Sequence, residues 1–208
     1  MKLSKHLDTL LRSLLAGIMI GIGGVIYLSC DNKYIGAFLF GLGLFTILTF
    51  GFNLYTGKIG YAVSNEPSYI IDLIIIWLGN LIGTMIVGLS VQFTRVGESL
   101  TEKAQVLCET KLNDNLISIF VLSIFCGLLM FVAADGYKNL TNQVAQVMVV
   151  FLPVVVFILS GFEHCVANMF YFTVSNMWGW QSVVWLAVMT AGNSVGGMLI
   201  PIVRKVII

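Results

Sequence analysis

Residues 160–169 read SGFEHCVANM and place a carboxylate, Glu163, beside an imidazole, His164, in an otherwise membrane-like part of the chain. No Asp, Glu, Lys, Arg or His occurs at residues 139–162 or at residues 165–203. An ionisable side chain at bilayer depth costs about 2.5–3.5 kcal/mol on insertion scales, so it is kept mainly where it lines a cavity or a transport path. The pair therefore indicates a functional site.

The composition around this stretch is that of an integral membrane protein. Hydrophobic residues make up 58% of the 208 residues and charged residues 10%, against about 25% charged residues in a soluble domain. That length has room for about six or seven spans of ~20 residues. A net charge of +1 argues against a nucleic-acid partner. The four cysteines show no CxxC spacing, so we expect no metal, no cofactor and no disulfide framework.

Polar turns divide the chain into apolar segments. The expected membrane helices are Ser13–Cys30, Tyr34–Gly57, Leu73–Thr94, Asn115–Ala134, Val144–Ser160 and Val183–Val203. Residues 1–12 alternate charged residues with leucines and predict a short amphipathic lead-in at the membrane surface. Residues 31–33 and 135–142 are expected to be polar turns, and residues 95–114 form the one long polar segment.

Two further segments are only about half a span long. They cover residues 57–65 and 164–176, and each follows a full apolar helix and precedes another. We expect the second helix to break near Leu54 and Tyr55, and Gly161 permits the fifth helix to break. Interrupted helices at matching places in two halves of a chain indicate a transport site.

A repeated motif supports the division of the chain into two related halves. Residues 79–84 read GNLIGT and residues 192–197 read GNSVGG. Glycines four residues apart let another helix approach closely, and Asn80 and Asn193 are placed to bond to backbone groups that a neighbouring broken helix leaves free. Generic packing of small residues is the simpler alternative. With three helices on each side of the polar segment, the repeat is expected to be inverted.

Basic residues set the expected orientation. One side carries Lys2, Lys5, Arg12, Lys138, Arg204 and Lys205, and the other carries Lys33, Arg95, Lys103 and Lys111. The excess predicts that both termini are cytoplasmic, in the inner or plasma membrane. We expect a single transmembrane channel domain, residues 1–208, with repeat halves of about 10–95 and 115–205.

Several side chains have both a structural and a functional interpretation. The only histidines are His6 and His164, which argues against a paired-histidine haem or a zinc site. His164 is either a hydrogen-bonded structural residue or a proton donor and polar gate, because imidazole titrates near neutral pH. Glu163 either ties helix ends together or belongs to the site.

Three other residues bear on a pore. Phe40 and Leu44 share a helix face, and large apolar side chains beside a polar centre can form a constriction that excludes hydrated ions. Ordinary core or lipid-facing packing is the alternative for each. Lys111 is either a solvated flanking charge or part of a vestibule that attracts anions.

The sequence resembles the formate/nitrite transporter family. The resemblance rests on residues 160–169, on NLYTG at residues 53–57 and on the two Gly-Asn-x-x-Gly segments, and it extends from about Leu10 to Arg204. It implies an all-α, aquaporin-like protomer of six transmembrane helices, with helices two and five interrupted. It also implies a homopentamer with one pore in each protomer, which passes small monovalent weak-acid anions such as formate, nitrite or hydrosulfide.

The resemblance also assigns residues. The pore and selectivity residues that it implies are His164, Thr56, Lys111, Glu163, Phe40, Leu44, Leu54, Tyr55, Phe157 and Asn168, and the residues that support the breaks are Asn80, Asn193, Gly57 and Gly161. The central histidine is His164, the break-loop threonine is Thr56 and the vestibule lysine is Lys111. Two departures stand out: Gly127 replaces the asparagine of many members, and Tyr55 stands where phenylalanine is usual.

We therefore expect an anion channel of the cell membrane rather than an enzyme, with formate or nitrite as the first candidates and hydrosulfide as an alternative. An anion that enters a low-dielectric neck pays for desolvation, so its pKa rises. It would take a proton from water or from His164 and cross as the neutral acid, held by Thr56. The rival hypotheses are an aquaporin-like water or glycerol channel, although no Asn-Pro-Ala sequence occurs, a membrane anchor of a redox complex, and a non-transporting scaffold.

Overall fold

The computed structural model describes residues 4–207, and within them the chain is helical, with no strand. Four helices are long and apolar enough to cross a membrane: α1 (Lys5–Ser29), α4 (Tyr69–Gln92), α6 (Leu116–Asn139) and α9 (Trp180–Ile207). Two apolar helices of 17 residues are α2 (Lys33–Thr49) and α7 (Gln143–Leu159). Each of these two leads through a break into a short helix, α3 (Tyr55–Lys58) or α8 (Cys165–Val174).

The turns between helices are short because their polar residues cap the next helix. The side chain of Asn32 accepts hydrogen bonds from the first backbone N–H groups of α2. Asn142 caps α7 in the same way, and Asn115 caps α6. Such caps satisfy N–H groups that have no partner within the helix. The polar turns found in the sequence thus fix where these helices begin.

Glycines bring the long helices into backbone contact in two pairs. A Cβ atom at Gly79 would meet Ser13 of α1, and one at Gly192 would meet Ser123 of α6, each at 2.5 Å. A Cβ atom at Gly127 would likewise meet the backbone of Asn193. Small residues at these crossings allow α4 to lie on α1 and α9 to lie on α6. The glycine at position 127 is therefore needed where it stands.

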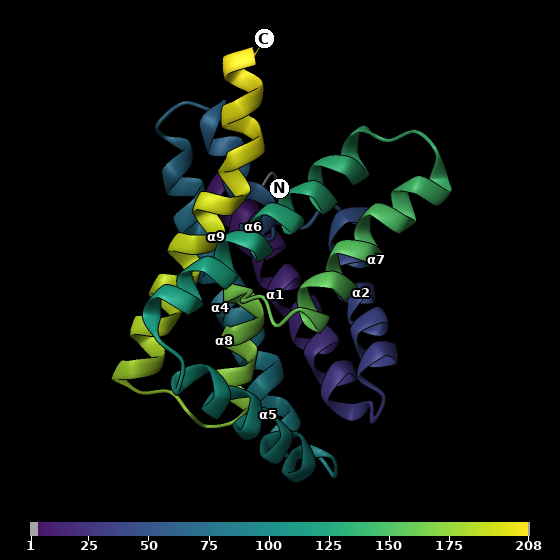
Figure 1. Cartoon of the computed structure of the whole chain (residues 1–208), viewed down its shortest axis with the longest axis vertical. Helices are drawn as coiled ribbons and strands as arrows, with labels where there is room; N and C mark the ends of the chain where they lie inside the picture. Colours follow the sequence, from purple (N-terminus) through teal and green to yellow (C-terminus); the bar gives the residue numbers. More distant parts are fainter. Residues whose placement is uncertain (1–3, 208) are drawn as a thin grey trace.

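Figure 1 shows how the two ends of the molecule differ. α9 ends at one side of the molecule, and α5 (Gly97–Leu112) lies at the opposite side. Ion pairs join Lys5 of α1 to Asp72 of α4 (2.7 Å) and Arg204 of α9 to Asp135 of α6 (2.6 Å). We call the side that holds these pairs the terminal face, and the side of α5 the opposite face.

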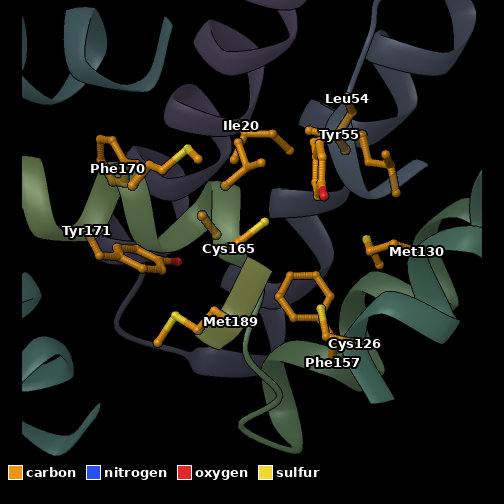
Figure 2. Packing of buried hydrophobic residues seen from close by; sticks show 14 of the residues in the cluster. Ile20, Leu54, Tyr55, Cys126, Met130, Phe157, Cys165, Phe170, Tyr171 and Met189 are labelled. Atoms are coloured by element: carbon orange, nitrogen blue, oxygen red, sulfur yellow. The ribbon is translucent and has the colours of Figure 1, made fainter. Parts of the chain in front are cut away.

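The most deeply buried element is α8. Every residue from Cys165 to Val174 is buried. Figure 2 shows Cys165 among apolar side chains from other helices, with Leu54 and Tyr55 on one side of it and Phe157 and Met130 on another. Its polar side chains Asn168 and Thr173 are buried together with the apolar ones, so every side of α8 faces protein. The second break therefore lies in the core.

Some boundaries differ from the sequence-based expectation. The turn expected at residues 135–142 is wrong in its first half, because α6 continues to Asn139. Asp135 remains helical and buried because Arg204 pairs with its carboxylate. Residues 5–12 of the expected lead-in are the first turns of α1, whereas residues 1–3 lie outside the described part.

Two other segments also depart from the expectation. The polar segment 95–114 is largely helical, as α5. The second helix ends at Thr49, several residues before Leu54 and Tyr55, and η1 (Ile59–Val63), a 3₁₀ helix, follows α3.

Candidate functional site

The two breaks have the same backbone design. After α2, Gly51 takes φ +67°, and after α7, Gly161 takes φ +69°. These left-handed conformations suit glycine because it has no Cβ. The N–H group of Phe52 then donates back to the carbonyl of Ile47 at 2.8 Å, which is the C-terminal cap of a helix that stops at a glycine. The chain runs on in extended form until the short helix begins.

Asn80 holds the first break in place. Its Oδ1 accepts a hydrogen bond from the Tyr55 N–H group at 2.8 Å, so it satisfies the first N–H group of α3. Its Nδ2 donates to the carbonyls of Ser13 (2.8 Å) and Asn53 (2.9 Å). One buried amide therefore joins α4, α1 and the break. Without it, the Tyr55 N–H group and the Asn53 carbonyl at the break would lose their partner.

Asn193 holds the second break with the same three bonds. Its Oδ1 accepts from the Cys165 N–H group at 2.8 Å, and its Nδ2 donates to the carbonyls of Ser123 (2.7 Å) and Glu163 (2.8 Å). The partners in the two sets occupy corresponding positions at the two breaks. The repeated Gly-Asn motif thus has a structural role at each break.

The breaks meet at Thr56 and His164. The Thr56 hydroxyl lies 2.9 Å from Nε2 of His164, and both side chains are fully buried. Thr56 is in the first turn of α3 and His164 is the N-cap residue of α8. Among the described residues, the Thr56 hydroxyl has no other hydrogen-bond partner. A threonine hydroxyl can both accept and donate, so one of its bonds is left for a ligand.

The second nitrogen of His164 fixes the state of the ring. Nδ1 accepts a hydrogen bond from the Ala167 N–H group at 3.0 Å. A ring nitrogen that accepts a hydrogen bond carries no proton, so the imidazole is neutral and its proton is on Nε2. His164 therefore donates to Thr56, and the hydroxyl hydrogen of Thr56 points elsewhere. The cap of α8 holds this arrangement.

Apolar side chains flank this pair. Phe40, Leu44, Leu54 and Phe157 are all buried, with at most 5% of each residue exposed. The rings of Phe40 and Phe157 meet edge to face with centroids 5.9 Å apart, and the Phe157 ring lies 5.7 Å from that of His164. Leu44 and Leu54 instead line a cavity. The four expected constriction residues are thus brought together near Thr56 and His164.

The cavity has a volume of about 410 Å³ and lies toward the terminal face. Its inner wall includes Leu44, Leu54 and Gly57, and its outer part includes Lys58 and Lys138. Gly57 is buried there, and a Cβ atom at this position would lie 3.2 Å from Ala134. An aqueous approach from the terminal face therefore reaches to within one or two residues of Thr56 along the chain.

Lys111, which is expected to face a vestibule, forms an ion pair. Its Nζ lies 2.7 and 2.8 Å from the two carboxylate oxygens of Glu163, and only 15% of its side chain is exposed. Asn168 donates to the same carboxylate at 2.8 Å. The pair joins the end of α5 to the second break, and Glu163 neutralises the lysine. The Oδ1 atom of Asn168 is buried without a partner among the described residues, which suits a water or a polar ligand.

Tyr55 points away from this site. Its hydroxyl lies 2.9 Å from Oγ of Ser194 on α9. Its ring lines an apolar groove between α4 and α9 that also includes Trp77. The backbone of Tyr55 belongs to the first break, but its side chain packs between helices. The departure from phenylalanine at this position therefore adds a contact to α9.

The sequence reasoning missed Lys58. It is half-buried in the cavity wall, two residues after Thr56. The signal was present, because Lys58 is the only ionisable group other than tyrosine in residues 34–65. The energetic cost of an ionisable side chain at bilayer depth, which draws attention to Glu163 and His164, applies equally to Lys58. Lys58 also adds to the basic residues of the terminal face, of which Lys2 lies outside the described part.

Comparisons with known proteins agree with this geometry. The sequence model of the family described as "Formate/nitrite transporter" matches residues 2–206. The "Formate channel FocA" of Haemophilus influenzae is 25% identical over 152 residues, which cover 67% of this chain and 52% of that protein. The "Formate channel FocA" of Escherichia coli K12 is 27% identical over 192 residues, which cover 81% of this chain and 67% of that protein. The chain thus spans about half to two thirds of these relatives.

A solved structure is similar over a larger share. A chain of a "Pentameric formate channel with formate bound" superposes with a TM-score of 0.81 at 26% sequence identity, and 97% of each chain is covered. All three of these proteins are described as channels.

Proposed function

Because this chain belongs to the formate/nitrite transporter family, we propose that it is a membrane channel for small monovalent weak-acid anions, with formate as the first candidate and nitrite as the second. Members of the family are channels and transporters, so the chain is not an enzyme. Formate is favoured because the relatives from Haemophilus influenzae and Escherichia coli are formate channels by name.

The observation that carries the proposal is the buried contact between Thr56 and His164, with the ring of Phe157 beside His164 and the buried Leu54 two residues before Thr56. A bare anion loses its hydration in such a neck, and nothing there replaces it with a positive charge, because the His164 ring is neutral. The ligand therefore crosses as the neutral acid. The free hydroxyl hydrogen of Thr56 donates to its carbonyl oxygen as it passes.

The proton comes from water outside the apolar neck. His164 cannot release its Nε2 proton at moderate cost, because Nδ1 accepts the Ala167 N–H group and the ring would become an anion. His164 instead orients Thr56. On leaving the neck, the acid returns its proton to water on the other side. Net movement of formic acid is then equivalent to symport of formate and a proton.

The architecture proposed with this function is a single domain, residues 1–208, with six spans in an aquaporin-like inverted repeat. In it, α2 with α3 and α7 with α8 are the interrupted helices. The matched glycine conformations and asparagine bonds at the two breaks support this arrangement. The long helices also pair in the same way, α1 with α4 and α6 with α9.

We further propose a homopentamer in the inner or plasma membrane, with the terminal face toward the cytoplasm. The similarity to a pentameric formate channel supports the assembly. The basic residues of the terminal face support the orientation, because cytoplasmic loops are enriched in lysine and arginine. Mass measurement of the detergent-solubilised protein tests the pentamer. Protease accessibility of tagged termini in inverted vesicles tests the orientation.

Flux assays in liposomes test the function. The wild-type protein should release formate down its gradient, and Thr56→Val and His164→Asn should each slow release about tenfold or more, because the ligand loses an oriented donor. Thr110→Val is the control, since Thr110 is on α5 and its hydroxyl donates to the Val106 carbonyl of its own helix. If the variants release formate at the same rate as the wild type and with the same pH dependence, Thr56 and His164 have no part in the mechanism.

Two further measurements test which solutes the protein transports. Competition among formate, nitrite and hydrosulfide ranks the three anions. Vesicle shrinkage in sucrose and glycerol tests the water-channel alternative, and rapid glycerol uptake without formate flux would contradict the proposal.

A further inference from the structure

The last turn of α9, at the terminal face (Figure 1), carries two cations where the uncharged part of the helix stops. Residues 165–203 contain no charged residue, and Arg204 and Lys205 follow directly. On α6, residues 115–134 are likewise uncharged and Asp135 comes next. Nη1 of Arg204 lies 2.6 Å from Oδ2 of Asp135, so the two uncharged runs end side by side. Lipid headgroups lie at the level where apolar spans end.

Two surface cavities flank the Arg204 side chain, with volumes of about 510 and 530 Å³. The walls of the first come from α6, α7 and α9, and they include the apolar side chains of Phe131, Val149 and Ile200. The second lies between α6, η1 and the end of α9, and it shares Phe131 and also includes Lys205. Each cavity thus combines apolar walls with at least one cation.

The cations outnumber the carboxylates at this place. Among the described residues, Asp135 is the one carboxylate in the walls of the two cavities, and Arg204 neutralises it. Lys205 has no carboxylate partner in the described part of the chain, and its Nζ donates to a backbone carbonyl at 3.2 Å. Lys138 adds a further charge, because its Nζ lies 5.3 Å from the centre of the Tyr61 ring, which lines the second cavity. The net charge of the cluster is therefore positive.

Asp135 orients the guanidinium of Arg204. The aspartate is buried, and its Oδ1 accepts a hydrogen bond from the Tyr61 hydroxyl at 3.4 Å. Among the described residues, only the Nη1 atom of the guanidinium takes part in the pair, and 58% of the Arg204 side chain is exposed. A guanidinium carries its N–H donors in a planar fork that matches the oxygens of a phosphate group. The donors that the pair does not use are left for such a group.

We propose that this cluster binds one anionic phospholipid in each chain, with the lipid phosphate at Arg204 and Lys205 and acyl chains against the apolar walls of the two cavities. A lipid fits better than a soluble anion, because the cavities combine cations with apolar side chains at the level of the headgroups. The net positive charge favours an anionic headgroup over a zwitterionic one. This inference goes beyond the proposed function and does not depend on which solute the protein transports.

The test is native mass spectrometry of the detergent-solubilised protein with phosphatidylglycerol or phosphatidylcholine. The wild type should bind phosphatidylglycerol more tightly. Lys205→Gln should raise the Kd for phosphatidylglycerol about fivefold, the effect expected for the loss of one cation beside an anionic headgroup, and should leave the Kd for phosphatidylcholine unchanged. Arg204→Lys should weaken phosphatidylglycerol binding by a similar factor, because it keeps a positive charge beside Asp135 but loses the planar fork.

Arg95→Gln is the matched control. Arg95 is exposed and lies between α4 and α5, at the opposite face, so its loss changes the net charge as Lys205→Gln does but leaves the cluster intact. The Kd for phosphatidylglycerol should stay at the wild-type value. Gel filtration before lipid is added shows that each variant is folded and assembled.

A second measurement separates a lipid from a soluble anion. Phosphatidylglycerol should raise the melting temperature of the wild-type protein, because a ligand that binds the folded state stabilises it. Glycerol phosphate carries the same phosphate chemistry without acyl chains, and at equal concentration it should leave the melting temperature unchanged. An equal rise with both compounds would show that a soluble anion is the ligand and would overturn the lipid site.

Two other results would also overturn it. One is equal affinity of the wild type for phosphatidylglycerol and phosphatidylcholine, and the other is an equal loss of affinity in Arg95→Gln and Lys205→Gln. Neither readout uses formate flux. Failure of the lipid site would therefore leave the proposed function standing, and absence of flux would leave the lipid site standing.

Discussion

The two breaks share a backbone and differ in chemistry. In both, a helix of 17 residues ends at a glycine with positive φ, and an asparagine from a long helix satisfies the first N–H group of the short helix that follows. The residue before the short helix is Leu54 in one break and His164 in the other. Within residues 4–207, the cation near the first break, Lys58, has no carboxylate beside it, whereas the cation near the second, Lys111, pairs with Glu163.

This difference shows which parts of a repeat are constrained. A chain that stops being helical at membrane depth must satisfy its free backbone groups internally, so the glycines and asparagines are needed in both copies. Side chains that are not needed to satisfy the backbone, including those of the proposed path, can differ between the two breaks. The result is two breaks with matching backbone bonds and different charges: among the described residues Lys58 has no carboxylate partner, whereas Lys111 is paired with Glu163.

The largest expected effect comes from breaking the scaffold. Asn80→Ala and Asn193→Ala should each destabilise the protein by about 3 kcal/mol or more, because each removes three hydrogen bonds and leaves buried backbone groups unpaired. Thermal unfolding in detergent measures the loss. Asn142→Ala, an exposed helix cap, should cost only about 1 kcal/mol. A large loss in one asparagine variant alone would mean that the two breaks are not equivalent.

The two lysines should respond differently to the same change. Lys111→Met should destabilise the fold by about 3 kcal/mol, because it leaves the buried Glu163 carboxylate without its partner. Lys58→Met should change stability by less than about 0.5 kcal/mol, since it removes no ion pair. Thermal unfolding of both variants compares them, and Lys111→Met combined with Glu163→Gln should recover part of the loss. Equal effects of the two lysine variants would contradict the asymmetry.

The turn glycines should give a smaller and matched effect. Gly51→Ala and Gly161→Ala should each cost about 1–2 kcal/mol, because alanine is strained at positive φ. No steric term adds to this at Gly161, where nothing lies within 4 Å of the place that a Cβ atom would take, and at Gly51 only the Arg12 guanidinium lies near, at 3.9 Å. Asn176→Gly is the control, because Asn176 already has φ 57°. Glycine suits that conformation but loses the exposed bond that Asn176 Oδ1 accepts from Gln92 at 3.2 Å, so the net change should stay within about 0.5 kcal/mol. Unequal changes in melting temperature for the Gly51 and Gly161 variants would show that the two turns are not equivalent.

The smallest effect concerns Tyr55, the first residue of α3. Tyr55→Phe should cost about 1 kcal/mol, because it removes only the hydrogen bond to Ser194 and keeps the ring between α4 and α9. Ser194→Ala should cost about the same, and the double variant should be no worse than either single one. Additive losses in the melting temperature would show that the two hydroxyls act independently.

Much of the fold follows from the sequence because membranes restrict it strongly. Long uncharged runs predict helices, and Gly161 followed by Glu163 and His164 predicts an interruption. The repeated Asn80 and Asn193 predict a partner for the backbone that the interruptions free. The end of α2 at Thr49 does not follow from the sequence, because residues 50–54 are also uncharged and mostly apolar. The continuation of α6 through Asp135 was hidden because the partner, Arg204, is distant in the sequence.

The sequence by itself determined that this chain is a helical membrane protein, that it breaks twice, and that an imidazole and a carboxylate lie inside it, because each of these depends on the energy of local groups in an apolar medium. Only the tertiary structure decided which charges are neutralised. The sequence does not distinguish the charge state of Lys111 from that of Lys58. The structure does, because Lys111 lies close enough to Glu163 to form an ion pair. Electrostatic pairing depends on distances between residues far apart in the chain, and folding sets those distances.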